Sequence, residues 1–209
     1  MYRQRNQYWK DRLTGWVQSW FSGPERRLKS GMQCVLLQLG SKGRLPAELD
    51  AVELFGMHGL WHTKDYIARV KHLEFFEIDK GYLELAKKSL ATFPVTFHHA
   101  DSIAWLHGRP RTFNFVVADI PYSGPFYADN GLPAFLDDLL HICAPGGVIV
   151  FNCHASRLAR HREMEHELRD RLGTRVLSDI FYVPRNSLIT YVVMCLDQNP
   201  GKDPGTTAR

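Results

Sequence analysis

The stretch Val52-Glu53-Leu54-Phe55-Gly56-Met57-His58-Gly59 decides the fold prediction. The apolar run Ala51–Phe55 ends at a glycine, and a second glycine follows three residues later. Such a run predicts a short buried strand, and the glycines let the backbone turn sharply and approach a ligand closely. The sequence therefore predicts a strand followed by a glycine turn, with the acidic Glu53 close to the strand end.

Strand-like and helix-like segments alternate after this turn. Further strands are predicted over Leu73–Ile78, Val95–His98, Phe113–Ala118, Val148–Asn152, Val176–Val183 and Ile189–Leu196. Helices are predicted over 65–71, 82–90, a short stretch after Asp101, 133–142 and 156–172, and a turn over 144–147. Alternation of this kind predicts an α/β fold, a mostly parallel seven-stranded sheet with helices on both faces. The last two strands have no helix between them, so the final strand is expected to run antiparallel.

Acidic residues recur where the predicted strands end. The second strand ends with Glu77-Ile78-Asp79, the third is followed by Asp101-Ser102, and the fourth by Asp119-Ile120-Pro121-Tyr122. In an open parallel sheet, ligands bind beyond the carboxyl ends of the strands. An acidic residue about 20 positions after a glycine loop can bind both hydroxyls of a ribose. The sequence thus predicts a ligand site at this edge.

The order of these motifs resembles the class I, Rossmann-like S-adenosylmethionine (SAM)-dependent methyltransferases over residues 50–196. The segment 52–59 is similar to the first motif of that family, and 77–86 to its acidic strand end and helix. Ala144-Pro145-Gly146-Gly147 is similar to its turn before the fifth strand. The family's seventh strand is antiparallel, as inferred above independently. A nicotinamide cofactor is disfavoured, since the loop is not GxGxxG.

The resemblance implies SAM as cofactor and a role for each strand-end residue. Glu53 and the backbone of the Gly56–Gly59 turn would hold the amino-acid end of SAM, Glu77 would bind the ribose, Ile78 would pack on the adenine, and Asp101 would accept from the adenine amino group. The cofactor-binding residues implied by the resemblance also include Phe55, Ser102 and Asp119. Met57 and His58 depart from the family pattern, which has a glycine and a small residue there. Their side chains either narrow the space for the methionine moiety or point away.

Asp119-Ile120-Pro121-Tyr122 is similar to the Asp-Pro-Pro-Tyr motif of enzymes that methylate exocyclic amines of nucleobases or glutamine amides. The resemblance implies three catalytic residues, Asp119, Pro121 and Tyr122. Asp119 and the Ile120 carbonyl would accept the hydrogens of a planar amine, while Tyr122 would stack on the acceptor and fix the angle of attack. Ile120 replaces the first proline of the motif. An open alternative is a plain strand end and turn, with Asp119 near the methionine group of SAM.

The positive charge of the chain belongs to its N-terminal part. Of 209 residues, 26 are Lys or Arg and 22 Asp or Glu, a net of +4; residues 1–31 hold seven and two, and residues 32–209 hold 19 and 20. Apolar residues at helical spacing predict two helices there, with Trp9, Trp16 and Trp20 on one face of the first. We divide the chain into an N-terminal helical arm or lid (1–46), a methyltransferase domain (47–196) and a disordered tail (197–209).

Several roles and classes remain open or are excluded. The tryptophan face could pack on the body, form a homodimer, bind nucleic acid or cover the acceptor as a lid. No run approaches the roughly 20 apolar residues of a membrane helix. Four cysteines without a CxxC motif predict a reduced, cytoplasmic protein. No metal site is predicted, because His98-His99, Cys153 and His154 lack ligand spacing.

The predicted function is transfer of a methyl group from SAM to an acceptor, most simply a planar, nucleobase-like amine nitrogen. One alternative is a small-molecule O-, N- or C-methyltransferase of metabolism with the arm as its lid. Another is a non-catalytic or aminopropyl-transferring protein on the same fold. The sequence does not name the acceptor, the atom methylated or the oligomeric state.

Overall fold

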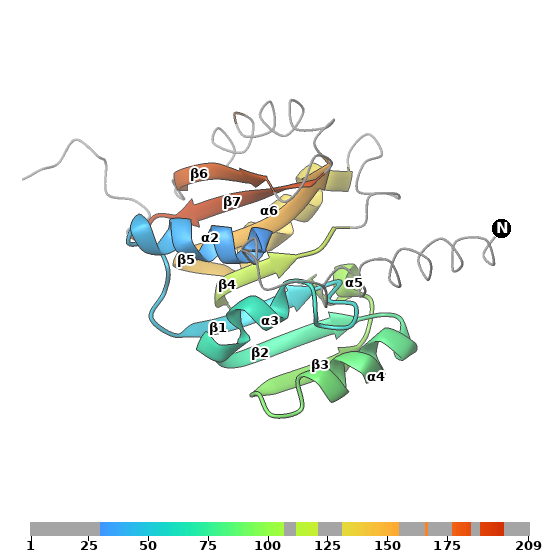
Figure 1. Cartoon of the computed structure of the whole chain (residues 1–209). Coiled ribbons are helices and arrows are strands. Elements are labelled where there is room, and N and C mark those ends of the chain that lie inside the picture. The colour runs from blue at the N-terminus through green and yellow to red at the C-terminus, as the bar shows by residue number, and fades with distance from the viewer. Residues whose placement is uncertain are drawn as a thin grey trace, which may run out of the picture.

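A seven-stranded sheet forms the centre of the molecule (Figure 1). The computed structural model describes residues 30–106, 112–120, 131–154, 166, 177–184 and 189–198. The strands are β1 (Leu49–Leu54), β2 (Val70–Glu77), β3 (Val95–His99), β4 (Phe113–Ala118), β5 (Cys143–His154), β6 (Leu177–Pro184) and β7 (Ile189–Leu196). Their order is β3-β2-β1-β4-β5-β7-β6, and β7 alone runs antiparallel to its neighbours. The predicted α/β sheet with an antiparallel last strand is confirmed.

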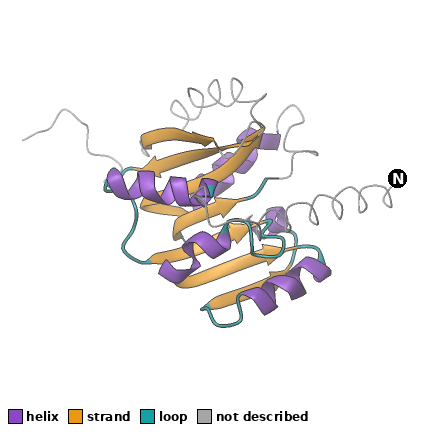
Figure 2. Cartoon of the chain, in the orientation of Figure 1, coloured by secondary structure: helices purple, strands orange, loops and turns teal. Residues whose placement is uncertain are grey.

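Helices cover both faces of this sheet (Figure 2). They are α2 (Gly31–Ser41), α3 (Thr63–Tyr66), the 3₁₀ turn η1 (Ile67–Arg69), α4 (Lys80–Ser89), α5 (Ser102–Leu106) and α6 (Gly131–Ile142). One core joins α2, α3 and α4 to one sheet face, and the other joins α5 and α6 to the opposite face. Along β1, Ala51 faces the first core while Val52 and Leu54 face the second. Burial on both faces explains why these strands read as nearly continuous apolar runs.

Helix α2 is fixed to the body by polar contacts at both ends. Ser30 caps the helix and forms a capping box with Gln33, and both side chains also donate hydrogen bonds to Asp65 of α3. At the other end, Lys42 Nζ lies 2.7 Å from Asp179 of β6. Because Met32, Val35 and Leu39 are also buried in the core, the described part of the second helix predicted for the arm packs on the sheet. Residues 1–29, which hold the tryptophan face, lie outside the described residues, as do most of the predicted helix 156–172 and residues 199–209.

Two predicted elements are wrong in detail. The helix predicted over 65–71 is shorter and earlier, because Val70 already pairs with Leu49 as the first residue of β2. The turn predicted over 144–147 lies inside β5 as an irregular stretch. Gly146 there has φ 74°, and its N–H donates to the Asp197 carbonyl over 2.9 Å, so the strand continues past the irregularity. Among the described residues, no helix has the length and apolar character needed to cross a membrane.

Candidate ligand site at the carboxyl ends of the strands

The turn after β1 is held between the two neighbouring strands. The Gly56 N–H donates to the Phe76 carbonyl of β2 over 3.0 Å, and the Asp119 N–H donates to the Leu54 carbonyl over 3.1 Å. These bonds join the carboxyl ends of β2, β1 and β4. The structure therefore brings Glu53, Glu77 and Asp119 to one edge of the sheet.

The backbone of this turn adopts left-handed conformations at three positions. Phe55 has φ 60°, Met57 φ 51° and Gly59 φ 70°. Glycine enters this region freely, whereas other residues pay roughly 1–2 kcal/mol there. Gly56 is required for a different reason, since a Cβ at this position would lie 2.3 Å from the Phe75 ring. Met57 thus keeps the left-handed backbone that glycine would adopt at its position. Phe55 has the same backbone conformation, which the sequence did not predict.

His58 points into a cluster of aromatic rings. Its ring meets those of Trp61 and Tyr82 edge-on, with centroids 5.8 and 6.2 Å away, and its Nδ1 accepts from the Leu60 N–H over 3.2 Å. Burial lowers the pKa of His58, and the Asp119 charge only partly offsets this effect. The second departure from the glycine motif is therefore a packed imidazole whose neutral form is favoured.

Glu53 is buried beneath the turn and bound to α3. Its Oε2 accepts hydrogen bonds from Thr63 Oγ1 over 2.6 Å and from the Tyr66 hydroxyl over 2.5 Å. Its Oε1 has no hydrogen-bond partner among the described residues. Burial raises the pKa of Glu53, although nearby His62 and the two hydroxyls oppose this effect. One oxygen of a buried carboxylate thus remains available to a donor, which is costly unless one is supplied.

Glu77 links the end of β2 to the turn. Its Oε2 accepts from the Met57 N–H over 2.8 Å, and its Oε1 accepts from the Asp79 N–H over 2.7 Å. The side chain is 6% exposed, and burial raises its pKa despite these bonds. Each carboxylate oxygen can accept one more hydrogen bond. The adjacent Ile78 is 64% exposed and presents an apolar surface beside this acceptor.

The end of β3 contributes Asp101 and Ser102. Asp101 is exposed and its Oδ1 accepts from the Ile103 N–H over 2.9 Å, at the start of α5. Ser102 is buried, and its Oγ accepts from the Phe55 N–H over 3.4 Å. Ser102 therefore binds the backbone of the turn after β1, whereas the Asp101 carboxylate is exposed to solvent.

Two side chains from other segments lie against Asp119, and a third lies behind one of them. His62 Nε2 lies 3.1 Å from its Oδ2, and Asn152 Nδ2 of β5 donates to its Oδ1. The Tyr191 hydroxyl of β7 lies 2.7 Å from His62 Nδ1. Ile120 is buried in the core next to this group. Pro121 and Tyr122, the other two predicted catalytic residues, lie outside the described residues.

Five polar residues of this edge were missed by the sequence analysis: His62, Thr63, Tyr66, Asn152 and Tyr191. Thr63 and Tyr66 stand three positions apart, so one helical turn directs both toward Glu53. Asn152 interrupts an apolar strand, which was the one local signal available. The link between His62 and Tyr191 spans 129 positions and follows from strand order alone.

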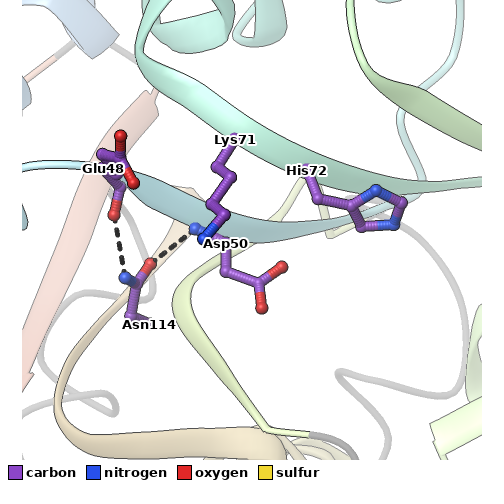
Figure 3. A pocket seen from close by; sticks show the side chains of 5 residues that line it. All are labelled: Glu48, Asp50, Lys71, His72 and Asn114. Atoms are coloured by element: carbon purple, nitrogen blue, oxygen red, sulfur yellow. Dashed lines mark hydrogen bonds between the residues drawn. The ribbon is translucent and has the colours of Figure 1, made fainter.

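A second group of polar side chains lines a pocket at the opposite edge of the sheet (Figure 3). Glu48, Asp50, Lys71, His72 and Asn114 surround it. Asn114 accepts from the Asp50 N–H and donates to the Glu48 carbonyl, both over 2.9 Å. Within the described part of the chain, no group of three or more His, Cys, Asp and Glu residues could hold a metal ion.

No protein-family model and no curated protein matches the sequence. Solved structures do match the fold. A SAM-dependent methyltransferase from Agrobacterium tumefaciens aligns with TM-score 0.59 at 16% identity, over 78% of this chain and 62% of that one. The N-methyltransferase NodS from Bradyrhizobium japonicum gives 0.56 at 14%, over 80% and 94%. A ribosomal protein L11 methylase from Lactobacillus delbrueckii subsp. bulgaricus gives 0.53 at 13%, over 80% and 78%. The chain thus has the class I fold that SAM-dependent methyltransferases share.

Proposed function

We propose that the protein is a SAM-dependent methyltransferase that binds its cofactor at the carboxyl ends of β1, β2 and β3. The observation that carries this proposal is the pairing of Glu77 with Ile78. A nearly buried carboxylate with spare acceptor capacity adjoins an exposed aliphatic side chain. Vicinal ribose hydroxyls fit the first and an adenine face fits the second. The residues at this edge therefore fit an adenosine-containing ligand.

The remaining strand ends fit the rest of SAM. Glu53 Oε1 is a buried acceptor without a partner among the described residues, and the ammonium of an amino acid would supply its missing donor. Asp101 is positioned to accept from an adenine amino group. Phe55, Gly56 and Gly59 contribute backbone to the turn that would face the ligand. When bound, SAM supplies an electrophilic methyl group on its sulfonium sulfur.

Within this proposal, Asp119 and the Ile120 carbonyl accept hydrogens from a planar amine and localise its lone pair. Asp119 Oδ1 already accepts from Asn152 Nδ2, and both carboxylate oxygens retain capacity for further donors. The transfer itself is an in-line displacement, which gains most from alignment of the two reactants. Pro121 and Tyr122 would complete the acceptor side, with Tyr122 stacked on the flat acceptor.

Calorimetry with SAM and with S-adenosylhomocysteine tests the cofactor. We expect Glu77→Gln to weaken SAM binding at least tenfold, because the amide removes the charge and one acceptor. Glu48→Gln, at the opposite edge, is the matched control and should bind as the wild type does. Thermal melts establish that both variants are folded. Unchanged affinity in Glu77→Gln would refute the ribose assignment.

A second candidate is a non-catalytic protein on this fold. The observation in its favour is that Phe55 and Met57 place side chains at left-handed positions of the turn. If the wild type shows no heat of binding at millimolar SAM, this candidate replaces the enzyme.

The acceptor remains a nucleic acid or a small molecule in this proposal, and the N-terminal segment is the part to test. Residues 1–31 carry a net charge of +5 and the body about −1. A variant lacking residues 1–29 should lose salt-sensitive RNA binding if the segment contacts phosphates. If it serves as a lid or a dimer contact, RNA binding stays as it was, and turnover or mass in solution changes instead.

A further inference from the structure

The end of β2 holds both groups proposed to bind adenosine, the Glu77 carboxylate and the Ile78 side chain. β3 pairs with β2 in parallel, with Glu77 opposite His99, and the Ala100 N–H donates to the Glu77 carbonyl over 3.3 Å. Beyond this bond β2 leads into α4 and β3 into α5, which pack on opposite faces of the sheet. The two chains therefore diverge at the point where Ile78 and Asp101 lie.

A side chain of β3 bridges these two chains. His99 Nε2 lies 3.0 Å from the carbonyl oxygen of Ile78, which is 21 positions earlier in the sequence. A carbonyl oxygen only accepts hydrogen bonds, so the ring nitrogen is the donor. This bond connects Ile78 to the strand that leads directly to Asp101.

The peptide group between Ile78 and Asp79 is bonded at both of its polar atoms. Its carbonyl accepts from His99, and its N–H donates to Glu77 Oε1 over 2.7 Å. Asp79 in turn caps α4 through its side chain. A peptide group held at both atoms does not rotate freely, so the direction of the exposed Ile78 side chain depends on the bond from His99. Without that bond, only the N–H of this peptide group remains held.

We propose that His99 is a positioning residue for the adenine subsite and keeps Ile78 at a fixed spacing from Asp101. The inference rests on the proposed function, in which Ile78 packs on the adenine face while Asp101 accepts from the adenine amino group. Both contacts form together only at the correct spacing. Hypoxanthine has the shape of adenine but an oxygen in place of the amino group, so two acceptors would face each other at Asp101. His99 therefore acts on the choice of base.

Three variants separate this role from general support of the fold. His99→Leu fills the space without a donor, whereas His99→Gln keeps an N–H donor close to the place of Nε2. His72→Leu is the matched control, because it changes a partly exposed histidine near the amino end of β2. Thermal melts establish that all three variants are folded.

Calorimetry on the full chain, with S-adenosylhomocysteine and with S-inosylhomocysteine, provides the readout. We expect the wild type to bind the adenosine compound at least about tenfold more tightly, because the site would bind its amino group. This ratio should fall about threefold to tenfold in His99→Leu, the value of one net hydrogen bond. It should return toward the wild-type value in His99→Gln and stay unchanged in His72→Leu. An equal loss of both affinities in His99→Leu would overturn the proposal, since a purely structural role leaves the ratio unaltered.

A double-mutant cycle with Asp101→Ala tests whether the effect passes through the adenine amino group. Once Asp101 has lost its carboxylate, His99→Leu should leave the ratio as it stands, and a further fall would overturn the proposal. Wild-type protein that binds neither compound would refute the proposed function and this inference together. Wild-type protein that prefers S-adenosylhomocysteine to the same extent as His99→Leu would overturn this inference alone and keep the proposed function.

Discussion

Acidic and polar residues lie at both the carboxyl and the amino ends of the parallel strands, but their side chains differ in burial. At the carboxyl edge, the side chains of Glu53, Glu77 and Asp119 are largely buried, and each accepts hydrogen bonds from side chains or backbone amides. At the amino edge, Asn114 bridges the backbone of Glu48 and Asp50 beside an open pocket (Figure 3). Burying a carboxylate is expensive, so a fold that does it repeatedly at one edge sacrifices stability there. Burial of its carboxylates thus distinguishes the carboxyl edge from the amino edge, where polar side chains line a pocket.

The largest expected effect is at the turn of the carboxyl edge. Gly56→Ala would place a Cβ 2.3–2.4 Å from two atoms of the buried Phe75 ring. Overpacking of a buried ring should lower the free energy of unfolding by about 3 kcal/mol, measured by urea denaturation. Gly40→Ala in α2 is the control, since its Cβ meets nothing within 4 Å. That change should stabilise by about 0.5–1 kcal/mol. A Gly56→Ala protein as stable as wild type would show that the turn is not held against β2.

The next effect concerns the charge of Glu53 and its dependence on pH. Burial raises the pKa of Glu53 above its ordinary 4.5, so the folded state holds this proton more tightly than the unfolded chain does. Its contribution to stability therefore falls as pH rises from about 4.5 through the raised value, by roughly 1.4 kcal/mol for each pH unit of the window.

Glu53→Gln lacks this titration. Unfolding curves of wild type and variant across this pH range should therefore diverge in favour of the variant as pH rises. Glu48→Gln, which changes an exposed carboxylate at the opposite edge of the sheet, is the matched control. A constant difference between the Glu53→Gln and wild-type curves would mean that the carboxyl is ionised as easily in the folded protein as in the unfolded chain.

A smaller effect is expected at the amino edge. Asn114→Ala removes two hydrogen bonds that join the start of β4 to the backbone before and within β1. Because water can replace both partners there, we expect a loss of about 1 kcal/mol in urea denaturation and no change in SAM affinity. A loss of SAM binding in Asn114→Ala would contradict the division of roles between the edges.

The smallest effect is expected for the ion pair between Lys42 and Asp179. The pair is 2.7 Å long, and its side chains are 37% and 30% exposed. Exposed pairs of this kind contribute about 0.2–1 kcal/mol. Lys42→Ala should cost no more than that, and the cost should shrink in 1 M salt, where screening is strong. A larger, salt-independent loss would mean that Lys42 contributes through more than its ion pair, for example through the contact of its Nζ with the Phe181 ring, 5.2 Å from the ring centroid.

The sequence predicted the sheet because its signals are local. Apolar runs such as Phe113–Ala118 are bounded by polar or turn residues. The last two predicted strands have no helix between them, and this was enough to predict that the final strand runs antiparallel. The carboxyl-edge acids were predicted for the same reason, since each lies at or directly after the end of its own strand.

The contacts of those acids could not be predicted. His62 and Tyr191 meet through strand order, and Thr63 reaches Glu53 because α3 begins earlier than its apolar spacing suggested. The left-handed backbone at Phe55 could not be predicted either. Residues other than glycine seldom adopt that conformation, and no sequence pattern indicates it here. Irregularities inside a strand, such as the one at Gly146, likewise resemble turns when only the sequence is read.

The place of β7 between β5 and β6 has a consequence for synthesis on the ribosome. β6 pairs with β7 and not with β5, so it has no strand to join until the last strand emerges. Until then β5 presents an unpaired edge to other nascent chains, the kind of edge that invites aggregation. Tyr191 arrives with that same strand. Closing the sheet and forming the hydrogen bond between Tyr191 and His62 are therefore one late event, and a chain interrupted before β7 would lack both.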